Sequence, residues 1–346
     1  MENKKLRVAI NGFGRIGRIF TRVAWENPNI EIVAINSRSP GDIYAHLLKY
    51  DSIYGVWDHE VTHNNDHEII VDGKHSIALY HENELENAPW KKHNVDVVLE
   101  STGVFRDRDS SQKHIDNGAK YVLISAPAKK EDKTLIYNIN HEQFDPAKHK
   151  IVSAASCTTT CLAPVAKILQ ENFGIKHGNV VTTHSYTNDQ HLVDHPHKGQ
   201  SFRRSRAAAM SIIPTATGAA KAISKVLPEL EGKLDGNALR VPVAVPSIIS
   251  FTAELEKGTT REEVNELFGD AAKLSPENLA TSDIGLVSVD YVRSPYGATV
   301  DCLSTQVIDD TMVFVQAWYD NEWGYVQQMA NLLTYMGSKI NTEDEE

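Results

Sequence analysis

The stretch AINGFGRIGR, residues 9–18, decides the fold. It follows the apolar run LRVAIN over 6–11 and opens a segment with helical spacing. In this G-x-G-x-x-G motif Gly12 allows a tight turn, Gly14 lets the backbone approach a pyrophosphate, and Gly17 allows the helix to pack closely on the strand. A structural turn in a domain that binds no nucleotide is the alternative. The motif in this setting predicts a dinucleotide site that includes Gly12, Gly14, Arg15, Ile16 and Gly17.

The second apolar run, EIVAIN over 31–36, indicates which dinucleotide is bound. An NAD site usually carries an acidic residue about 20 positions after the glycine motif, where it holds the ribose hydroxyls. Here the strand ends at Asn36 and continues with Ser37 and Arg38, so no carboxylate repels a 2′-phosphate. The sequence therefore predicts NADP competence beside NAD. The alternative is that Asn36 binds a ribose while Arg38 is only solvated.

The fold class follows from how the apolar runs are spaced. Runs at 6–11, 31–36, 95–101 and 121–126 alternate with helix-like segments, which is typical of a parallel sheet, and 57–80 is expected to form inserted antiparallel strands. After Cys157 longer strand-like stretches appear at 179–187, 241–255 and 311–320. We expect an α/β Rossmann dinucleotide-binding domain over 1–156, then an α+β domain over 157–321 with a mostly antiparallel sheet.

Bulk composition limits the function classes. The 346 residues include 35 Lys and Arg against 46 Asp and Glu, a formal net charge of −11. This balance argues against nucleic acid or a membrane surface as partner. No run approaches the ~18 apolar residues of a membrane span, and no signal-peptide pattern opens the chain. Three cysteines indicate a reducing compartment, so we expect a cytoplasmic protein.

Cys157 is the first candidate for chemistry. It lies between the apolar run 151–156 and a helix-like segment, where a helix N-terminus would lower the pKa of a thiol. His184, between a buried strand and a polar loop, is the candidate base. Whether Cys157 is a nucleophile or a packed thiol stays open from these residues alone. Cys161 and Cys302 are expected to be packed, and because no ligand cluster accompanies Cys157 and Cys161, we expect no metal.

Short hydroxyl side chains and two arginines suggest a phosphorylated substrate. Backbone and hydroxyl donors of this kind bind anions, and the stretch TATGAA over 215–220 is expected to open a helix that cradles one. The alternative is that these hydroxyls cap helices and satisfy loops. The candidates are Ser156, Thr158, Thr187, Thr217 and Gly218, with Arg204 and Arg240 for charge.

Seven ordered motifs carry a resemblance to a known family. They are NGFGRIGR, SCTTTCLAP, HSYTNDQ, RRSRAA, IIPTATGAAKA, LDGNALRVP and WYDNEWGY, and the likeness extends from about residue 5 to 335. In this order they resemble glyceraldehyde-3-phosphate dehydrogenase. The resemblance implies a Rossmann domain, a catalytic domain, a C-terminal helix over 322–346 that packs back on the first domain and ends in an acidic tail, and a homotetramer.

The resemblance also implies roles for individual residues. Cys157 matches the nucleophile and His184 its base, for phosphorylating oxidation of D-glyceraldehyde 3-phosphate to 1,3-bisphosphoglycerate through a thiohemiacetal and a thioester. The remaining matches are Thr187, Asp189 and Arg240 around the substrate phosphate, Ser156, Thr158, Thr217 and Gly218 around inorganic phosphate, Asn321 and Tyr325 near the nicotinamide, and Thr102, Gly103 and Ser125 along the cofactor.

Departures from the family pattern leave alternatives open. Thr160 stands where SCTTNC usually has Asn, and the loop between Lys198 and Arg203 is two residues longer than the familiar form. The rival hypotheses are an erythrose-4-phosphate dehydrogenase, a paralogue whose acyl acceptor is another oxyanion such as arsenate, and a catalytically silent binding protein. The retained Cys157, His184 and Arg240 argue against the silent protein.

Overall fold

The computed structural model describes residues 4–343, which form two compact units. Of the described residues, the first unit comprises 4–155 together with 326–343, and the second comprises 156–325. The end of the acidic tail, 344–346, lies outside the described residues. No helix within 4–343 is long and apolar enough to cross a membrane.

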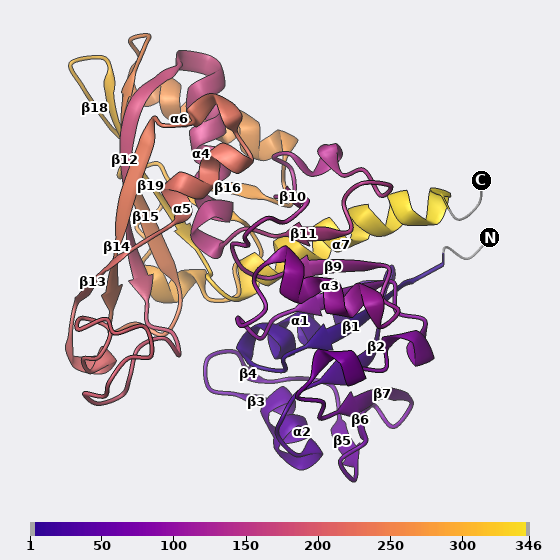
Figure 1. Ribbon diagram of the computed structural model, residues 1–346. Coiled ribbons are helices and arrows are strands. Elements are labelled where there is room, and N and C mark those ends of the chain that lie inside the picture. The colour runs from indigo at the N-terminus through magenta and orange to yellow at the C-terminus, as the bar shows by residue number, and fades with distance from the viewer. Residues whose placement is uncertain (1–3, 344–346) are drawn as a thin grey trace. The chain divides into compact units, whose positions relative to one another are not determined.

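A mixed sheet forms the core of the first unit, in the order β10-β11-β9-β8-β1-β2-β7-β6-β5 (Figure 1). The pairings from β10 to β7 are parallel, and β6 and β5 add antiparallel strands at one edge. The parallel strands and the antiparallel insertion are as the sequence predicts. The bounds are β1 Leu6–Asn11, β2 Ile30–Asn36, β5 Val61–Asn64, β6 Glu68–Val71, β7 His75–Tyr80, β8 Val97–Glu100, β9 Tyr121–Ile124, β10 Lys133–Thr134 and β11 Ile151–Ser153, with a small separate pair β3 Tyr50–Asp51 and β4 Gly55–Val56.

The register of the central strands brings three polar residues together. Asn11, the last residue of β1, is opposite both Asn36 of β2 and Glu100 of β8. The three residues directly before each of them in these strands, 8–10, 33–35 and 97–99, are buried and apolar, as expected for a parallel sheet covered on both faces. The polar residues therefore mark the carboxyl ends of the strands, the edge at which open α/β sheets bind their ligands.

Helices α1 Arg15–Trp25, α2 Gly41–Lys49 and α3 Arg108–Asp116 complete the first unit, together with α7 Trp323–Glu343 from Val326 onward. The predicted helical spacing of α7 is confirmed, because Val326, Met329, Leu333 and Met336 are all buried. Gly337 of this helix lies against Leu6 of β1, so α7 packs on the nucleotide-binding half of the chain. Thr334 of α7 also accepts a hydrogen bond from Asn27, at 3.0 Å.

The second unit contains a mainly antiparallel sheet in the order β13-β14-β12-β15-β19-β17-β16, with β18 beside β19. The pairs β12–β14 and β16–β17 are parallel, and in the first of these His184 is opposite Arg240. The bounds are β12 Ile175–Ser185, β13 Ile213–Ala216, β14 Leu234–Val241, β15 Ser247–Leu255, β16 Leu279–Ser282, β17 Ala298–Asp301, β18 Gln306–Ile308 and β19 Met312–Tyr319, and the helices are α4 Cys157–Phe173, α5 Ala219–Ala222 and α6 Arg261–Leu274.

Two local predictions differ from the structure. The stretch 241–255 is not one strand: β14 ends at Val241 and β15 begins at Ser247, because Pro242 and Pro246 lack the N–H groups that a ladder requires. The stretch 215–220 does not simply open a helix, because β13 runs to Ala216 and α5 is a single short turn.

Candidate active site

The three glycines of the nucleotide motif have different surroundings. Gly12 has a φ of 95°, and a Cβ there would lie 2.7 Å from the Thr102 nitrogen. A Cβ on Gly17 would lie 2.4 Å from the Gly12 oxygen, so α1 packs directly on the turn. At Gly14 nothing lies within 4 Å of the Cβ position. The backbone at Gly14 is therefore open to a ligand, which fits the pyrophosphate of a dinucleotide.

A cavity of about 500 Å³ lies at the carboxyl ends of β1, β2 and β8. Its lining includes six residues predicted from the sequence: Gly12, Gly14, Asn36, Ser37, Arg38 and Thr102. It also includes residues that the sequence did not single out, among them Phe13, Arg18, Tyr44, Leu47, Glu82, Ser101 and Phe105. Five predicted cofactor residues of the first unit, Arg15, Ile16, Gly17, Gly103 and Ser125, are not part of this lining, and neither are Asn321 and Tyr325 of the second unit. Arg15 instead pairs with Asp51 at 2.9 Å.

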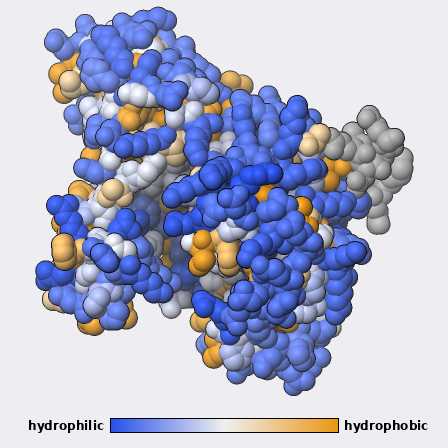
Figure 2. All heavy atoms as spheres, in the orientation of Figure 1, coloured by the Kyte–Doolittle hydropathy of each residue, from blue (hydrophilic) through white to orange (hydrophobic). Residues whose placement is uncertain are grey.

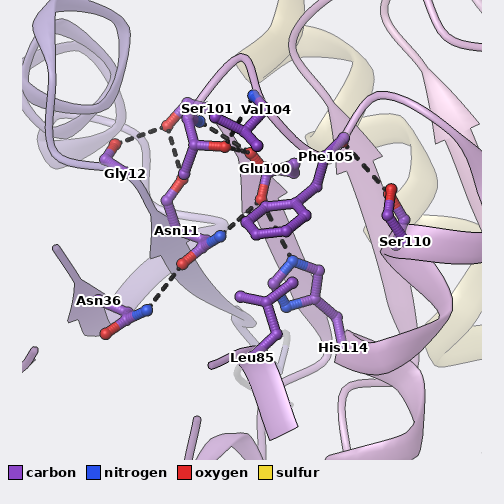
Figure 3. Close-up of polar contacts among 12 residues, drawn as sticks. Asn11, Gly12, Asn36, Leu85, Glu100, Ser101, Val104, Phe105, Ser110 and His114 are labelled. Carbon is purple, nitrogen blue, oxygen red and sulfur yellow. Dashed lines mark hydrogen bonds and ion pairs between the residues drawn. The ribbon is translucent and has the colours of Figure 1, made fainter. Parts of the chain in front are cut away.

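A buried polar network holds the strand ends beneath this cavity (Figure 3). The Glu100 carboxylate accepts hydrogen bonds from Asn11 Nδ2 at 2.6 Å and from the Thr102 N–H at 2.8 Å, and it faces His114 Nε2 at 3.2 Å. Trp90 Nε1 donates to the other ring nitrogen of His114 at 3.0 Å. Because each member is paired, the network stabilises the turn that carries the glycines, as satisfied buried networks do.

Asn36 is held by the same network. Its amide donates to Asn11 Oδ1 at 2.9 Å and to the Glu82 carbonyl at 3.0 Å, and its Oδ1 accepts the Glu82 N–H at 2.8 Å. Both amide hydrogens are therefore engaged inside the protein. Arg38 is exposed and has no ion-pair partner among residues 4–343.

In the second unit Cys157 is the first residue of α4. Ser156 caps the helix and accepts the Thr159 N–H at 3.1 Å. The preceding Ala155 has a φ of 57°, a left-handed conformation that is strained for alanine. Strain of this kind persists where the surroundings fix the backbone, and here it lies two residues before the thiol.

The Cys157 sulfur lies 3.5 Å from His184 Nε2. Burial raises the pKa of the Cys157 thiol, although the charge of Arg240 and the hydrogen bonds from Thr158 act to lower it. The sequence predicted a lowered pKa from the helix N-terminus, and in the structure burial is the larger effect. Burial and then the Arg240 charge lower the pKa of His184 to about 3, so both groups are neutral before substrate binds.

The second ring nitrogen of His184 has two competing partners. Nδ1 lies 2.8 Å from the Ser185 carbonyl, which requires a hydrogen on Nδ1, and 2.7 Å from Arg240 Nη1, which requires a lone pair. Arg240 Nη1 also donates to the Ser185 carbonyl at 3.0 Å. With its hydrogen on Nδ1 the ring can accept a proton at Nε2, and with its hydrogen on Nε2 it can donate toward the sulfur.

Tyr319, which the sequence did not single out, organises the hydroxyls beside this pair. Its OH hydrogen-bonds to Thr158 Oγ1 at 2.9 Å and to Thr182 Oγ1 at 2.7 Å. Burial raises the pKa of Tyr319, so the ring stays a neutral phenol. Asn321 is also buried, and its Oδ1 accepts a hydrogen bond from Ser247 at 3.0 Å. Burial likewise raises the pKa of Tyr325.

The remaining phosphate candidates form a second group. Asp189 accepts Arg204 Nη1 and lies 3.0 Å from His197 Nε2, while the Thr187 N–H donates to Gln190 at 2.9 Å. Burial and then the charge of Arg240 lower the pKa of Arg204, so the two guanidinium groups are close enough to repel each other. Such a pair attracts a doubly charged anion.

Other predicted residues take supporting positions. Thr217 accepts the Ala219 N–H at 3.2 Å, and Gly218 is exposed beside it. Cys161 is fully buried, which confirms it as packed, whereas Cys302 is only half-buried. Thr160 is buried on α4. Across residues 4–343 no three His, Cys, Asp or Glu side chains are grouped so that they could hold a metal ion.

Comparison with known proteins identifies two family domains in the chain. Residues 6–108 match the NAD binding domain of glyceraldehyde 3-phosphate dehydrogenase, and residues 156–321 match its C-terminal domain. The chain is 51% identical to "Glyceraldehyde-3-phosphate dehydrogenase" of Geobacillus stearothermophilus over 335 residues, 96% of this chain and 99% of that protein. It is 48% identical to "Glyceraldehyde-3-phosphate dehydrogenase 2" of Bacillus subtilis, over 97% of this chain and 98% of that protein. The protein of the same name from Trichormus variabilis is also 48% identical, over 96% and 99%.

Proposed function

The chain belongs to the glyceraldehyde-3-phosphate dehydrogenase family and is an NAD-dependent oxidoreductase, and we propose that Cys157 and His184 carry its chemistry. It oxidises D-glyceraldehyde 3-phosphate to 1,3-bisphosphoglycerate with inorganic phosphate. The observation that supports these two residues is the 3.5 Å contact between the Cys157 sulfur and His184 Nε2 at the start of α4.

The first step joins the sulfur to the aldehyde. Cys157 forms a bond to the carbonyl carbon while its proton passes to His184 Nε2, which the Ser185 carbonyl leaves free by holding the hydrogen on Nδ1. The proton then moves to the carbonyl oxygen and gives a thiohemiacetal. In this proposal the Cys157 N–H and His184 stabilise the oxygen as it gains charge, an effect worth about 3 kcal/mol in related sites.

Oxidation and phosphorolysis complete the cycle. NAD, when bound, supplies the hydride acceptor. His184 takes the hydroxyl proton as hydride leaves the carbon, and a thioester to Cys157 remains. An oxygen of inorganic phosphate attacks the thioester carbon, the carbon–sulfur bond breaks, and the thiolate recovers a proton. The acyl phosphate departs, and one proton in total is released.

The two phosphate groups are assigned to separate residues. Arg240 and the group of Thr187, Asp189 and Arg204 provide the charge and hydrogen bonds for the substrate phosphate. Ser156, Thr158, Thr217 and Gly218 are assigned to inorganic phosphate. Asn321 and Tyr325 are assigned to the nicotinamide end of the cofactor, and Thr102, Gly103 and Ser125 to the rest of it.

NADP is proposed as a second cofactor besides NAD. Ser37 and Arg38 line the cavity where β2 ends, and the guanidinium of Arg38 is available to a 2′-phosphate. Arg38→Ala should weaken NADP binding about tenfold or more, because a charge-assisted hydrogen bond is lost, and should leave NAD binding nearly unchanged. Equal effects on both cofactors would mean that Arg38 is only a solvated charge.

A homotetramer in the cytoplasm is the proposed working form. Between residues 186 and 212 several large apolar side chains are exposed, including Leu192 at 86% and Phe202 at 92%. In Figure 1 the loops of this segment lie beside β13, and Figure 2 shows hydrophobic residues on that part of the surface. A patch of this kind favours burial against another copy of the chain. Light scattering in solution measures the assembly directly.

The deciding experiment is steady-state reduction of NAD and of NADP with glyceraldehyde 3-phosphate, with and without inorganic phosphate. We expect phosphate-dependent turnover, which Cys157→Ser abolishes while cofactor binding remains. Turnover that does not need phosphate, or that is faster with erythrose 4-phosphate, would favour the sister enzyme. The same assay with arsenate in place of phosphate tests the hypothesis that another oxyanion is the acyl acceptor. Full activity in Cys157→Ser would overturn the assignment of the nucleophile.

A further inference from the structure

A pair of hydroxyl groups lies in the wall of the nucleotide cavity, where β2 passes into α2. Ser37 Oγ and the Tyr44 OH are joined by a short hydrogen bond. Each oxygen also accepts one backbone N–H: Phe13 donates to Ser37 at 3.1 Å, and Ser39 donates to Tyr44 at 3.0 Å. The Tyr44 ring is 7% exposed and packs edge-to-face on Phe13, with centroids 5.3 Å apart.

Counting hydrogens shows what this pair can offer. Two hydroxyl groups have two hydrogens, and one of them lies in the bond between Ser37 and Tyr44. None of these three contacts uses the second hydrogen. The pair can therefore donate one hydrogen bond to a ligand in the cavity. Burial acts to raise the pKa of Tyr44, but the hydrogen bonds from Ser37 and Ser39 outweigh it and the pKa is lowered. A more acidic hydroxyl is a stronger donor toward an anion.

The free hydrogen of this pair indicates a ligand that accepts a hydrogen bond. A carboxylate at the end of β2 can only accept hydrogen bonds, as from ribose hydroxyls, whereas this pair also has a hydrogen to donate. Asn36 cannot substitute as donor, because Asn11 and Glu82 take both of its amide hydrogens. A phosphate oxygen only accepts, and Arg38 provides positive charge on the same wall.

We propose that Tyr44 determines selectivity for NADP, by holding the Ser37 hydroxyl so that the pair donates a hydrogen bond to the adenosine 2′-phosphate. The inference rests on the proposed NADP function and extends it to a residue on α2. Tyr44 acts through Ser37 as well as directly, so its contribution is distinct from the charge of Arg38.

The test measures binding by calorimetry, without turnover. Tyr44→Phe keeps the ring on Phe13 and removes only the hydroxyl. We expect its affinity for NADP to fall about tenfold or more, the range for one hydrogen bond to a charged group, and its affinity for NAD to change less than about twofold. The adenosine fragments 2′,5′-ADP and 5′-AMP should show the same contrast. Ser37→Ala, which leaves the ring untouched, should repeat it, and Tyr50→Phe, an exposed tyrosine outside this cavity, is the matched control.

The outcomes separate this inference from the proposed function. If the unmodified protein binds NADP and both variants lose NADP affinity selectively, the role of Tyr44 is supported. If it binds NADP but Tyr44→Phe affects the two cofactors equally or neither of them, the inference is overturned while the NADP proposal stands. If the unmodified protein binds NAD but neither NADP nor 2′,5′-ADP, the NADP proposal fails and this inference fails with it.

Discussion

Two buried histidines, one in each unit, have surroundings of opposite charge. His114 is 0% exposed and lies beside the Glu100 carboxylate, whereas His184 is 4% exposed and lies beside the Arg240 guanidinium. Burial is therefore nearly the same for both rings. What differs is the sign of the neighbouring charge and the use of the two ring nitrogens.

His114 has one assignable arrangement. The Trp90 N–H can only donate, so Nδ1 of His114 accepts, and the ring hydrogen lies on Nε2 toward Glu100. His184 has two arrangements, because the Ser185 carbonyl and Arg240 make opposite demands on Nδ1, and its Nε2 faces a thiol rather than a fixed partner. A buried histidine becomes useful for proton transfer when one ring nitrogen is left for the substrate and the other has partners both with and without its hydrogen.

Replacing His184 should give the largest effect. His184→Asn removes the proton acceptor beside Cys157 and should lower kcat about 10²–10⁴-fold, the range for a general base. The unfolding midpoint and the cofactor affinity should stay close to those of the unmodified protein. Steady-state kinetics and calorimetry measure the two properties separately. His177→Asn, an exposed position on the same strand β12, is the control. A kcat within about threefold of the unmodified enzyme would remove His184 from the proposed mechanism.

Replacing His114 should give the reverse pattern. His114→Phe fills a similar space but leaves the buried Trp90 N–H without its partner, and it removes one hydrogen bond from Glu100, whose Oε2 still accepts from Asn11. Each unsatisfied buried group costs about 1–3 kcal/mol, so we expect a clear fall in the unfolding midpoint while kcat at saturating cofactor is retained. Thermal unfolding beside kinetics tests this, with the exposed His67→Phe as control. Lost kcat with an unchanged midpoint would instead give His114 a functional role.

The parts of the molecule that the sequence predicts are those that depend on neighbouring residues in the chain. The glycine motif and the apolar runs predict β1, β2, β8 and β9 to within a few residues, because periodicity and turn chemistry are local properties. The strand expected over 241–255 is wrong because two prolines interrupt the ladder, and these are visible in the sequence. Local chemistry therefore accounts for most of the fold.

The polar networks could not be predicted in the same way. Asn11 meets Glu100 across 89 positions of sequence, and Thr158 meets Tyr319 across 161, so only the sheet register brings each pair together. Glu100 ends an apolar run and gives no sign of its partners. The thiol pKa differs from expectation for a related reason: a helix N-terminus can be inferred from sequence, whereas the degree of burial depends on the whole unit.

A third histidine, His59, shows how neighbouring charge acts on an imidazole at the surface. There a substitution should have the smallest effect of the three. His59 Nε2 lies 2.8 Å from Glu26 and Nδ1 lies 2.7 Å from Asp72, joining the end of α1 to the turn between β6 and β7. Burial acts to lower the pKa of His59, but the hydrogen bonds and charges of the two carboxylates outweigh it, and the pKa is raised. The folded protein therefore binds this proton more tightly than the unfolded chain does.

Stabilisation by His59 should accordingly be complete below its unfolded pKa of about 6.5 and be lost as the pH rises through the higher folded value. Compared with the unmodified protein, His59→Asn should unfold roughly 1–2 °C lower at pH 6 and at nearly the same temperature at pH 9, because exposed ion pairs contribute little. Thermal unfolding at both values measures the difference, and 0.5 M salt should reduce it by screening the charges. A difference that grows with pH would mean that the pKa of His59 is lowered in the folded protein, so that burial outweighs the attraction of the two carboxylates to the imidazolium. The comparison of His114 with His184 by the sign of the neighbouring charge would then not extend beyond the buried sites.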